Sequence, residues 1–117
     1  MNSWNINLCD LYLKELPDFI KDLDVSCFYI SNNRLTSLEG CPQIVGRHFD
    51  CSQNKLTSLK GCPKKIGGYF DCTNNLLESL DGCPTEVTGS FFCFSNTVKF
   101  SRDYINSICK VYGHIYC

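Results

Sequence analysis

The chain has 117 residues, of which 44% are hydrophobic and 20% are charged, and its formal net charge is -1 at pH 7. This length and composition fit one globular domain, and the near-neutral charge gives no electrostatic reason to expect nucleic acid or an anionic membrane as a partner. The apolar runs are far shorter than the ~20 residues that span a bilayer, and the charged residues of the first 20 positions do not fit a secretory signal, so we expect a cytoplasmic protein.

Residues 1–27 are predicted to form an N-terminal cap. Apolar side chains recur here without a strict period, at Ile6, Leu8, Leu11, Leu13 and Leu16. Pro17 follows and is well suited to open a short helical turn over residues 18–23. We expect this segment to be a degenerate first repeat that covers the start of the regular ones.

Residues 28–98 consist of near-copies set 21 residues apart. Three registers define the period: Phe28, Phe49, Phe70 and Phe91; Asn33, Asn54, Asn75 and Asn96; and the Gly-Cys-Pro triplets that begin at Gly40, Gly61 and Gly82. A period this short predicts one small structural unit stacked on itself.

Each unit is predicted to begin with a short half-buried strand. In the unit that starts at Phe49, the apolar Phe49 and Cys51 alternate with polar Asp50 and Ser52, which is the period-two pattern of such a strand. We expect Asn54 and its equivalents to hydrogen-bond the backbone where the chain leaves the sheet. In the rest of the unit, Leu56 and Leu59 are expected to point into the core and Gly61 to form a tight turn. Ile66 is expected to close the other side of the core as the chain returns to the next strand.

Residues 99–117 lack the Gly-Cys-Pro triplet and are predicted to form a helical C-terminal cap. Ser101 is a suitable N-cap. Apolar residues then recur at three- and four-residue spacing, at Tyr104, Ile105, Ile108, Val111, Tyr112 and Ile115. We expect one amphipathic helix across the open end of the core.

The chain contains ten cysteines, and six of them fall in the repeat. Cys51, Cys72 and Cys93 occupy a position that holds Ile30 in an earlier repeat, which indicates an apolar packing site for a small hydrophobic side chain. A disulfide framework and a metal site are the alternatives. Each repeat position holds three cysteines, and three thiols cannot all be paired in disulfides. The chain has no CxxC motif, and His48 and His114 are its only histidines, which argues against a metal site. We therefore expect buried, reduced thiols and no metal.

The succession Phe-x-Cys-x-x-Asn-x-Leu-x-x-Leu-x-Gly-Cys-Pro resembles the leucine-rich repeat, in particular its short bacterial and phage form. The resemblance is close over residues 28–98 and loose over residues 5–27. It implies an α/β solenoid with a parallel β-sheet on the concave face, a mostly irregular convex side and a cap at each end. It also implies that outward-pointing strand residues form the recognition surface.

The candidate partner-binding residues are therefore the outward residues of the strands: Tyr29, His48, Asp50, Tyr69, Asp71, Thr73, Phe92 and Phe94. Aligned aspartates repel one another and add no stability of their own, which favours a basic partner, and rigid aromatic side chains are typical of interface hot spots. Two alternatives stay open: the polar members form an ordinary solvated strand face, and Phe92 and Phe94 are covered by the C-terminal segment.

No catalytic site or cofactor site is predicted. His48 and Asp50 share a strand face but would lie on open surface, and Gly67-Gly68 lacks the surroundings of a phosphate-binding loop. We expect a non-catalytic module, a monomer or weak homo-oligomer without cofactor. It would bind and modulate, most simply inhibit, a host or partner protein, as a phage host-takeover or anti-defence factor acting in the host cytoplasm. The alternatives are a self-associating component of a virion or surface assembly, and binding of a nucleic acid or nucleotide through the strand aromatics.

Overall fold

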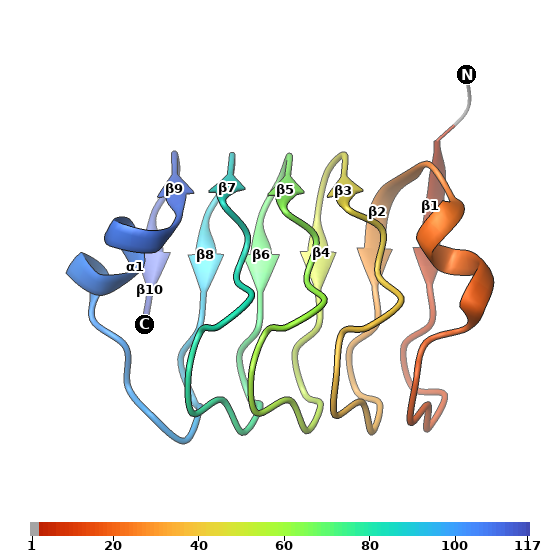
Figure 1. The fold of residues 1–117 in the computed structure, drawn as a ribbon, viewed down its shortest axis with the longest axis horizontal. Coiled ribbons are helices and arrows are strands. Elements are labelled where there is room, and N and C mark those ends of the chain that lie inside the picture. Colours follow the sequence, from red (N-terminus) through yellow and green to blue (C-terminus); the bar gives the residue numbers. More distant parts are fainter. Residues whose placement is uncertain (1–2) are drawn as a thin grey trace.

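The computed structural model describes residues 3–117 and shows a solenoid-like repeat fold built on parallel strands (Figure 1). The molecule measures 36 × 29 × 18 Å along its principal axes. The stacking of one short unit on the next, expected from the 21-residue period, is confirmed. The first two residues of the predicted 1–27 cap lie outside the described part of the chain.

The first row of strands contains the repeated phenylalanines. It is formed by β2 (Val25–Tyr29), β4 (Phe49–Asp50), β6 (Phe70–Asp71), β8 (Phe91–Phe92) and β10 (Ile115–Tyr116), with β1 (Trp4–Asn7) beside β2. All neighbours are parallel, and Phe28, Phe49, Phe70 and Phe91 pair in register. The predicted strands are therefore confirmed, and outward residues also align from one repeat to the next.

A second row of strands lies on the return side of each repeat, where a mostly irregular path was expected. It consists of β3 (Ile44–Val45), β5 (Lys65–Ile66), β7 (Glu86–Val87) and β9 (Lys110–Val111). Figure 1 shows the arrows of this row pointing opposite to those of β4, β6 and β8, because the chain turns back between the rows. The long strand β2 joins both rows into one ten-stranded sheet. Nine strands follow the order β10-β8-β6-β4-β2-β3-β5-β7-β9, and the tenth, β1, pairs with β2 off this path.

The core lies between the two rows. The phenylalanine rings stack along the solenoid, with centroids 5.4 Å apart for Phe28 and Phe49 and 5.7 Å for Phe49 and Phe70. The leucines of the repeat and the return residues Val45, Ile66 and Val87 complete it, and all are buried. Cys51, Cys72 and Cys93 are buried among them at the position of Ile30, so their apolar packing role is confirmed.

The N-terminal segment contains the expected helical turn. A 3-10 helix, η1, runs over Asp18–Asp22 directly after Pro17. Its one buried residue is Ile20, which packs with Leu16 onto the core of the first regular repeat. Strand β1 extends the first row of strands beyond β2, as a degenerate repeat should.

The prediction of one long C-terminal helix is wrong beyond Ile108. Helix α1 covers Arg102–Ile108, and the Ser101 side chain accepts a hydrogen bond from the Tyr104 N–H, as expected. Residues 110–111 and 115–116 are instead strands β9 and β10, which pair with β7 and β8. Val111 and Ile115 pair with Val87 and Phe91. In the repeat the inward residues of the two rows are also four positions apart, so the same spacing fits both a helix and this pair of strands.

The turns of the repeat impose backbone conformations that the sequence pattern did not reveal. Asn32, Gln53, Asn74 and Ser95, each one position before the repeated asparagine, have φ of 55°, 54°, 55° and 59°. Gly61 and Gly82 have φ of 90° and 86°, and a side chain on either would meet the backbone of the preceding repeat. Glycine at these two positions is therefore needed both for its conformation and for the close stacking of repeats.

Candidate functional site

The outward side chains of the first strand row gather on one surface, here called the strand face: Tyr29, His48, Asp50, Tyr69, Asp71, Phe92 and Tyr116. Register pairing aligns Tyr29 with Asp50, Asp50 with Asp71, Asp71 with Phe92, and Phe92 with Tyr116. His48 and Tyr69 come directly before their strands β4 and β6 and form a second line beside the first. The structure thus brings the predicted strand residues together.

Aromatic rings run continuously along this face. His48 stacks on Tyr69 with centroids 4.2 Å apart, Tyr69 meets Phe92 edge-on at 6.1 Å, and Phe92 stacks on Tyr116 at 4.8 Å. We call these four residues the aromatic row. Their rings are held by neighbours in adjacent repeats, so the row presents a pre-organised contact surface.

His48 is fixed in this row by a hydrogen bond to the backbone. Its Nδ1 atom accepts from the Tyr69 N–H at 3.1 Å, which requires that nitrogen to be unprotonated. Burial, together with the positive charge of Arg47, lowers the pKa of His48. The neutral imidazole is therefore the form that fits the strand face.

The two aspartates have a structural role that the sequence did not predict. The Oδ1 atom of Asp50 accepts from the Ser52 N–H, and that of Asp71 accepts from the Thr73 N–H, both at 2.9 Å. Each carboxylate thus fastens the chain where it leaves a strand. Partial burial raises the pKa of Asp71, against the effect of its hydrogen bonds with Thr73, and the negative charge of Asp50 raises it further.

Three predicted residues differ from one another in their access to a partner. Thr73 is only 4% exposed, and its hydroxyl donates to Asp71 Oδ1 at 2.7 Å, so it supports the face rather than forming its surface. Phe92 is half-buried under Tyr116, which agrees with coverage by the C-terminal segment, whereas Phe94 is 46% exposed. Tyr116 was not predicted as a site residue because its segment was expected to be helical. The sequence does contain a signal for it, since an apolar residue that points inward, Ile115, directly precedes it, as Phe91 precedes Phe92.

Tyr29 lies next to Asp50 on the N-terminal side of the two aspartates. A hydrogen bond with the Cys27 thiol, followed by burial, raises the pKa of Tyr29 to about 12, so the hydroxyl stays protonated. It remains available as a donor and acceptor at the rim of the strand face.

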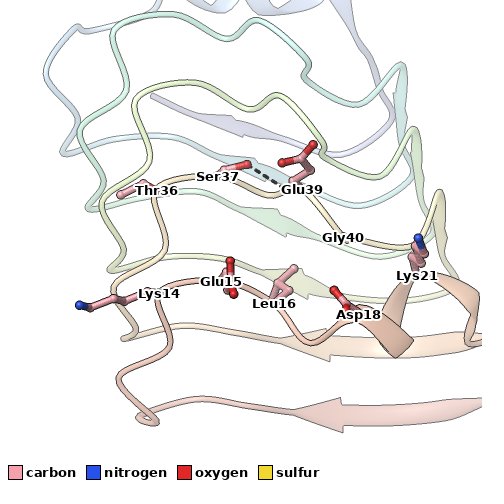
Figure 2. Close-up of a pocket in the computed structure, with 9 residues that line it drawn as sticks. All are labelled: Lys14, Glu15, Leu16, Asp18, Lys21, Thr36, Ser37, Glu39 and Gly40. Atoms are coloured by element: carbon pink, nitrogen blue, oxygen red, sulfur yellow. Dashed lines mark hydrogen bonds between the residues drawn. The ribbon is translucent and has the colours of Figure 1, made fainter.

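A recess on the opposite side of the molecule is lined by charges of both signs. Figure 2 shows Lys14, Glu15, Asp18 and Lys21 of the N-terminal segment opposite Glu39 of the first regular repeat. The Ser37 hydroxyl there accepts a hydrogen bond from the Glu39 N–H at 2.9 Å and shapes the local turn. The alternation of charges gives this recess no preference for an anion or a cation.

Three cysteines of the repeat lie in surroundings that make their thiols unreactive. All ten are free thiols in the structure, and burial raises the pKa of Cys51, Cys62 and Cys72 well above the ordinary value. Such thiols are poor nucleophiles because the thiolate is the reactive form. Within residues 3–117, no group of three or more histidine, cysteine or acidic side chains is arranged to hold a metal ion.

Comparison with protein-family models, with curated proteins and with solved structures gives no match for this chain. Among the described residues, no helix is long and apolar enough to cross a membrane.

Proposed function

We propose that this chain is a non-catalytic interaction module of the short leucine-rich-repeat type, which binds a partner protein through its strand face. The succession of strand, asparagine turn, paired leucines and glycine turn in every repeat supports the family assignment. On the phage resemblance, the partner is a host protein in the cytoplasm, and binding inhibits it, as a host-takeover or anti-defence factor would.

The aromatic row is the observation that carries this proposal. Its rings are stacked across four successive strands or their leading residues, so little side-chain entropy is lost when a partner covers them. Tyrosine and other aromatic side chains in such positions commonly dominate binding energy.

Affinity capture from a bacterial lysate tests the proposal. The wild-type chain is compared with Asp50→Arg plus Asp71→Arg, which reverses the charge of the strand face, and with Glu39→Arg plus Asp81→Arg, which makes the same change at exposed positions of the return side. Circular dichroism checks that both variants remain folded. We expect one protein to be captured by the wild type and the return-side variant and lost from the strand-face variant. Equal capture by all three would exclude the strand face.

Self-association is the second candidate function, because strands β9 and β10 each have a hydrogen-bonded neighbour on one side only within residues 3–117. Unpaired strand edges can add a strand from another chain. Light scattering across a wide concentration range tests this function. A strict monomer at high concentration would count against an assembly role and would leave the strand-face proposal untouched.

A further inference from the structure

An acidic pair on the strand face is surrounded by aromatic rings. Along the outward register, Asp50 and Asp71 lie between Tyr29 and Phe92, and Tyr69 lies beside them in the neighbouring line. The two carboxylates belong to directly paired residues of parallel strands, whose backbones lie ~4.8 Å apart. Negative charge and partly exposed aromatic rings thus occur at the same place.

Cation–π pairs occur elsewhere in the described part of the chain, but none is found at Tyr69. Arg34 lies over Tyr12 and Lys110 lies over Tyr112, each 5.0 Å from the ring centroid. At Tyr69, burial together with the negative charges of Asp50 and Asp71 raises the pKa of the hydroxyl. Arg47 acts on Tyr29 and His48 at the edge of the strand face, but within residues 3–117 no cation of the chain lies over the Tyr69 ring.

We propose that the strand face binds an arginine side chain of its protein partner, with the guanidinium beside the Tyr69 ring and paired with the carboxylates of Asp50 and Asp71. This inference rests on the proposed function and specifies the chemistry of the partner. Each aspartate uses Oδ1 for its own turn, so the second oxygen is the one that receives the guanidinium.

Arginine fits this surface better than the other cationic or planar groups. Its planar guanidinium stacks on an aromatic face and donates in two directions at once, whereas the lysine ammonium is a compact and strongly hydrated point charge. A nucleic acid or nucleotide would also offer planar rings, but its phosphates would be repelled by the adjacent aspartates.

Peptide titration followed by NMR tests the inference. The probes are acetyl-Gly-Arg-Gly-Arg-Gly-amide and matched peptides with lysine or with citrulline, which keeps the planar shape of arginine without its charge. The backbone N–H groups of Ser52 and Thr73 report on the site directly, because they donate to the two carboxylates. We expect the arginine peptide to shift both signals in a saturable way, the lysine peptide to bind more weakly, and the citrulline peptide to leave them unchanged.

Paired variants separate binding at this site from general attraction. Asp50→Asn plus Asp71→Asn keeps an oxygen acceptor for each turn, and we expect it to weaken the arginine peptide by about tenfold or more. Glu39→Gln plus Asp81→Asn removes the same charge from the return side and should bind like the wild type. Equal binding of the citrulline peptide, or unchanged binding by the first variant, would overturn the inference.

The two proposals fail in different ways. If the captured partner is lost from Tyr69→Ala but retained by Asp50→Asn plus Asp71→Asn, the strand face binds its partner without arginine. If capture is unaffected by both variants, the strand face itself is excluded.

Discussion

Single side chains in this protein combine a task in folding with a place on the exposed surface. Asp50 and Asp71 fasten the turns after their strands while their second oxygens stay free. His48 accepts the Tyr69 N–H while its ring forms one end of the aromatic row. A substitution at these positions therefore changes stability and binding together, unless it preserves the accepting atom.

The pH dependence of stability should reveal the role of His48. Its pKa is lowered in the folded protein, so the unfolded chain takes up a proton at higher pH than the folded one. The contribution to stability is then complete above the unfolded pKa of about 6.5 and is lost as the pH falls through that value toward the folded pKa. We expect a loss of about 0.5 kcal/mol or less, because the ring is largely solvent-screened.

Asn is the informative substitution for His48. Its Oδ1 atom can accept the Tyr69 N–H but does not titrate, so His48→Asn should show a flatter stability profile between about pH 7 and pH 5. Urea unfolding at a series of pH values measures this, with His114→Asn as the control. An identical profile for wild type and His48→Asn would show that His48 does not contribute.

At the scale of the element, each repeat is joined to the preceding one through its asparagine and its glycines. Asn75 donates from Nδ2 to the carbonyls of Cys51, Cys72 and Thr73, and its Oδ1 accepts from the Leu56 N–H at 3.1 Å. The sequence predicted this hydrogen bonding from the position of asparagine after each strand. It did not predict that one side chain would connect two repeats, because that requires the stacked geometry.

Asn75→Ala should be strongly destabilising. It leaves buried backbone groups of two repeats without partners, at a cost of about 3 kcal/mol or more in the free energy of unfolding. Asn96 makes the equivalent bonds at a partly exposed position, so water can replace them and Asn96→Ala should cost less. Urea unfolding of both variants measures the difference, and equal losses would contradict the role of burial.

Gly46 and Gly67 occupy the same repeat position but differ in their surroundings. A side chain at Gly67 would overlap the carbonyl oxygen of Gly46, whereas a side chain at Gly46 would lie 3.5 Å from its nearest atom, the carbonyl oxygen of Val25. We expect Gly67→Ala to cost about 2–4 kcal/mol and Gly46→Ala to change stability by less than about 1 kcal/mol. Thermal unfolding of the two variants provides the comparison, and similar melting temperatures would be inconsistent with the stacking described.

For the whole molecule, the repeat period made most of the architecture predictable. The phenylalanine and asparagine registers gave the strands of the first row and the turns after them, and Pro17 and Ser101 marked two helical starts. The second row was not predictable, because strands of two residues contain no alternation to detect. Residues 109–117 were misinterpreted because Val111 and Ile115 satisfy both a helical period and the spacing between the two rows.

The candidate site was predictable only as far as the repeat extended. Alternation within the strands identified the outward residues from Tyr29 to Phe92, and their alignment followed from the period. The contribution of Tyr116 was missed with β10 itself. Thr73 is buried, as is Ser52 at the same position of the preceding repeat, because the chain turns after the strand and the alternation of the strand ends there.

Thiol accessibility tests the packing of the whole solenoid. Seven of the ten cysteines are buried, and Cys9, Cys83 and Cys117 are the partly exposed ones. We expect Cys9 and Cys117 to react quickly with an aromatic disulfide reagent in the native protein. Cys83 should react more slowly, because a hydrogen bond with Cys109 and burial raise its pKa, and the other seven should react only as the protein unfolds. In denaturant without reductant all ten should react. Fewer than ten would reveal disulfides that the structure does not contain.

The final repeat shows which part of the unit tolerates a change in length. His114 bonds to Ser90 at a spacing of 24 residues rather than 21, and α1 replaces the Gly-Cys-Pro turn, yet both rows of strands continue in register. Insertions on the return side therefore leave the strand face undisturbed. During evolution, such a protein can gain or lose whole units, or lengthen individual return segments, and so adjust the extent of its binding surface one strand at a time.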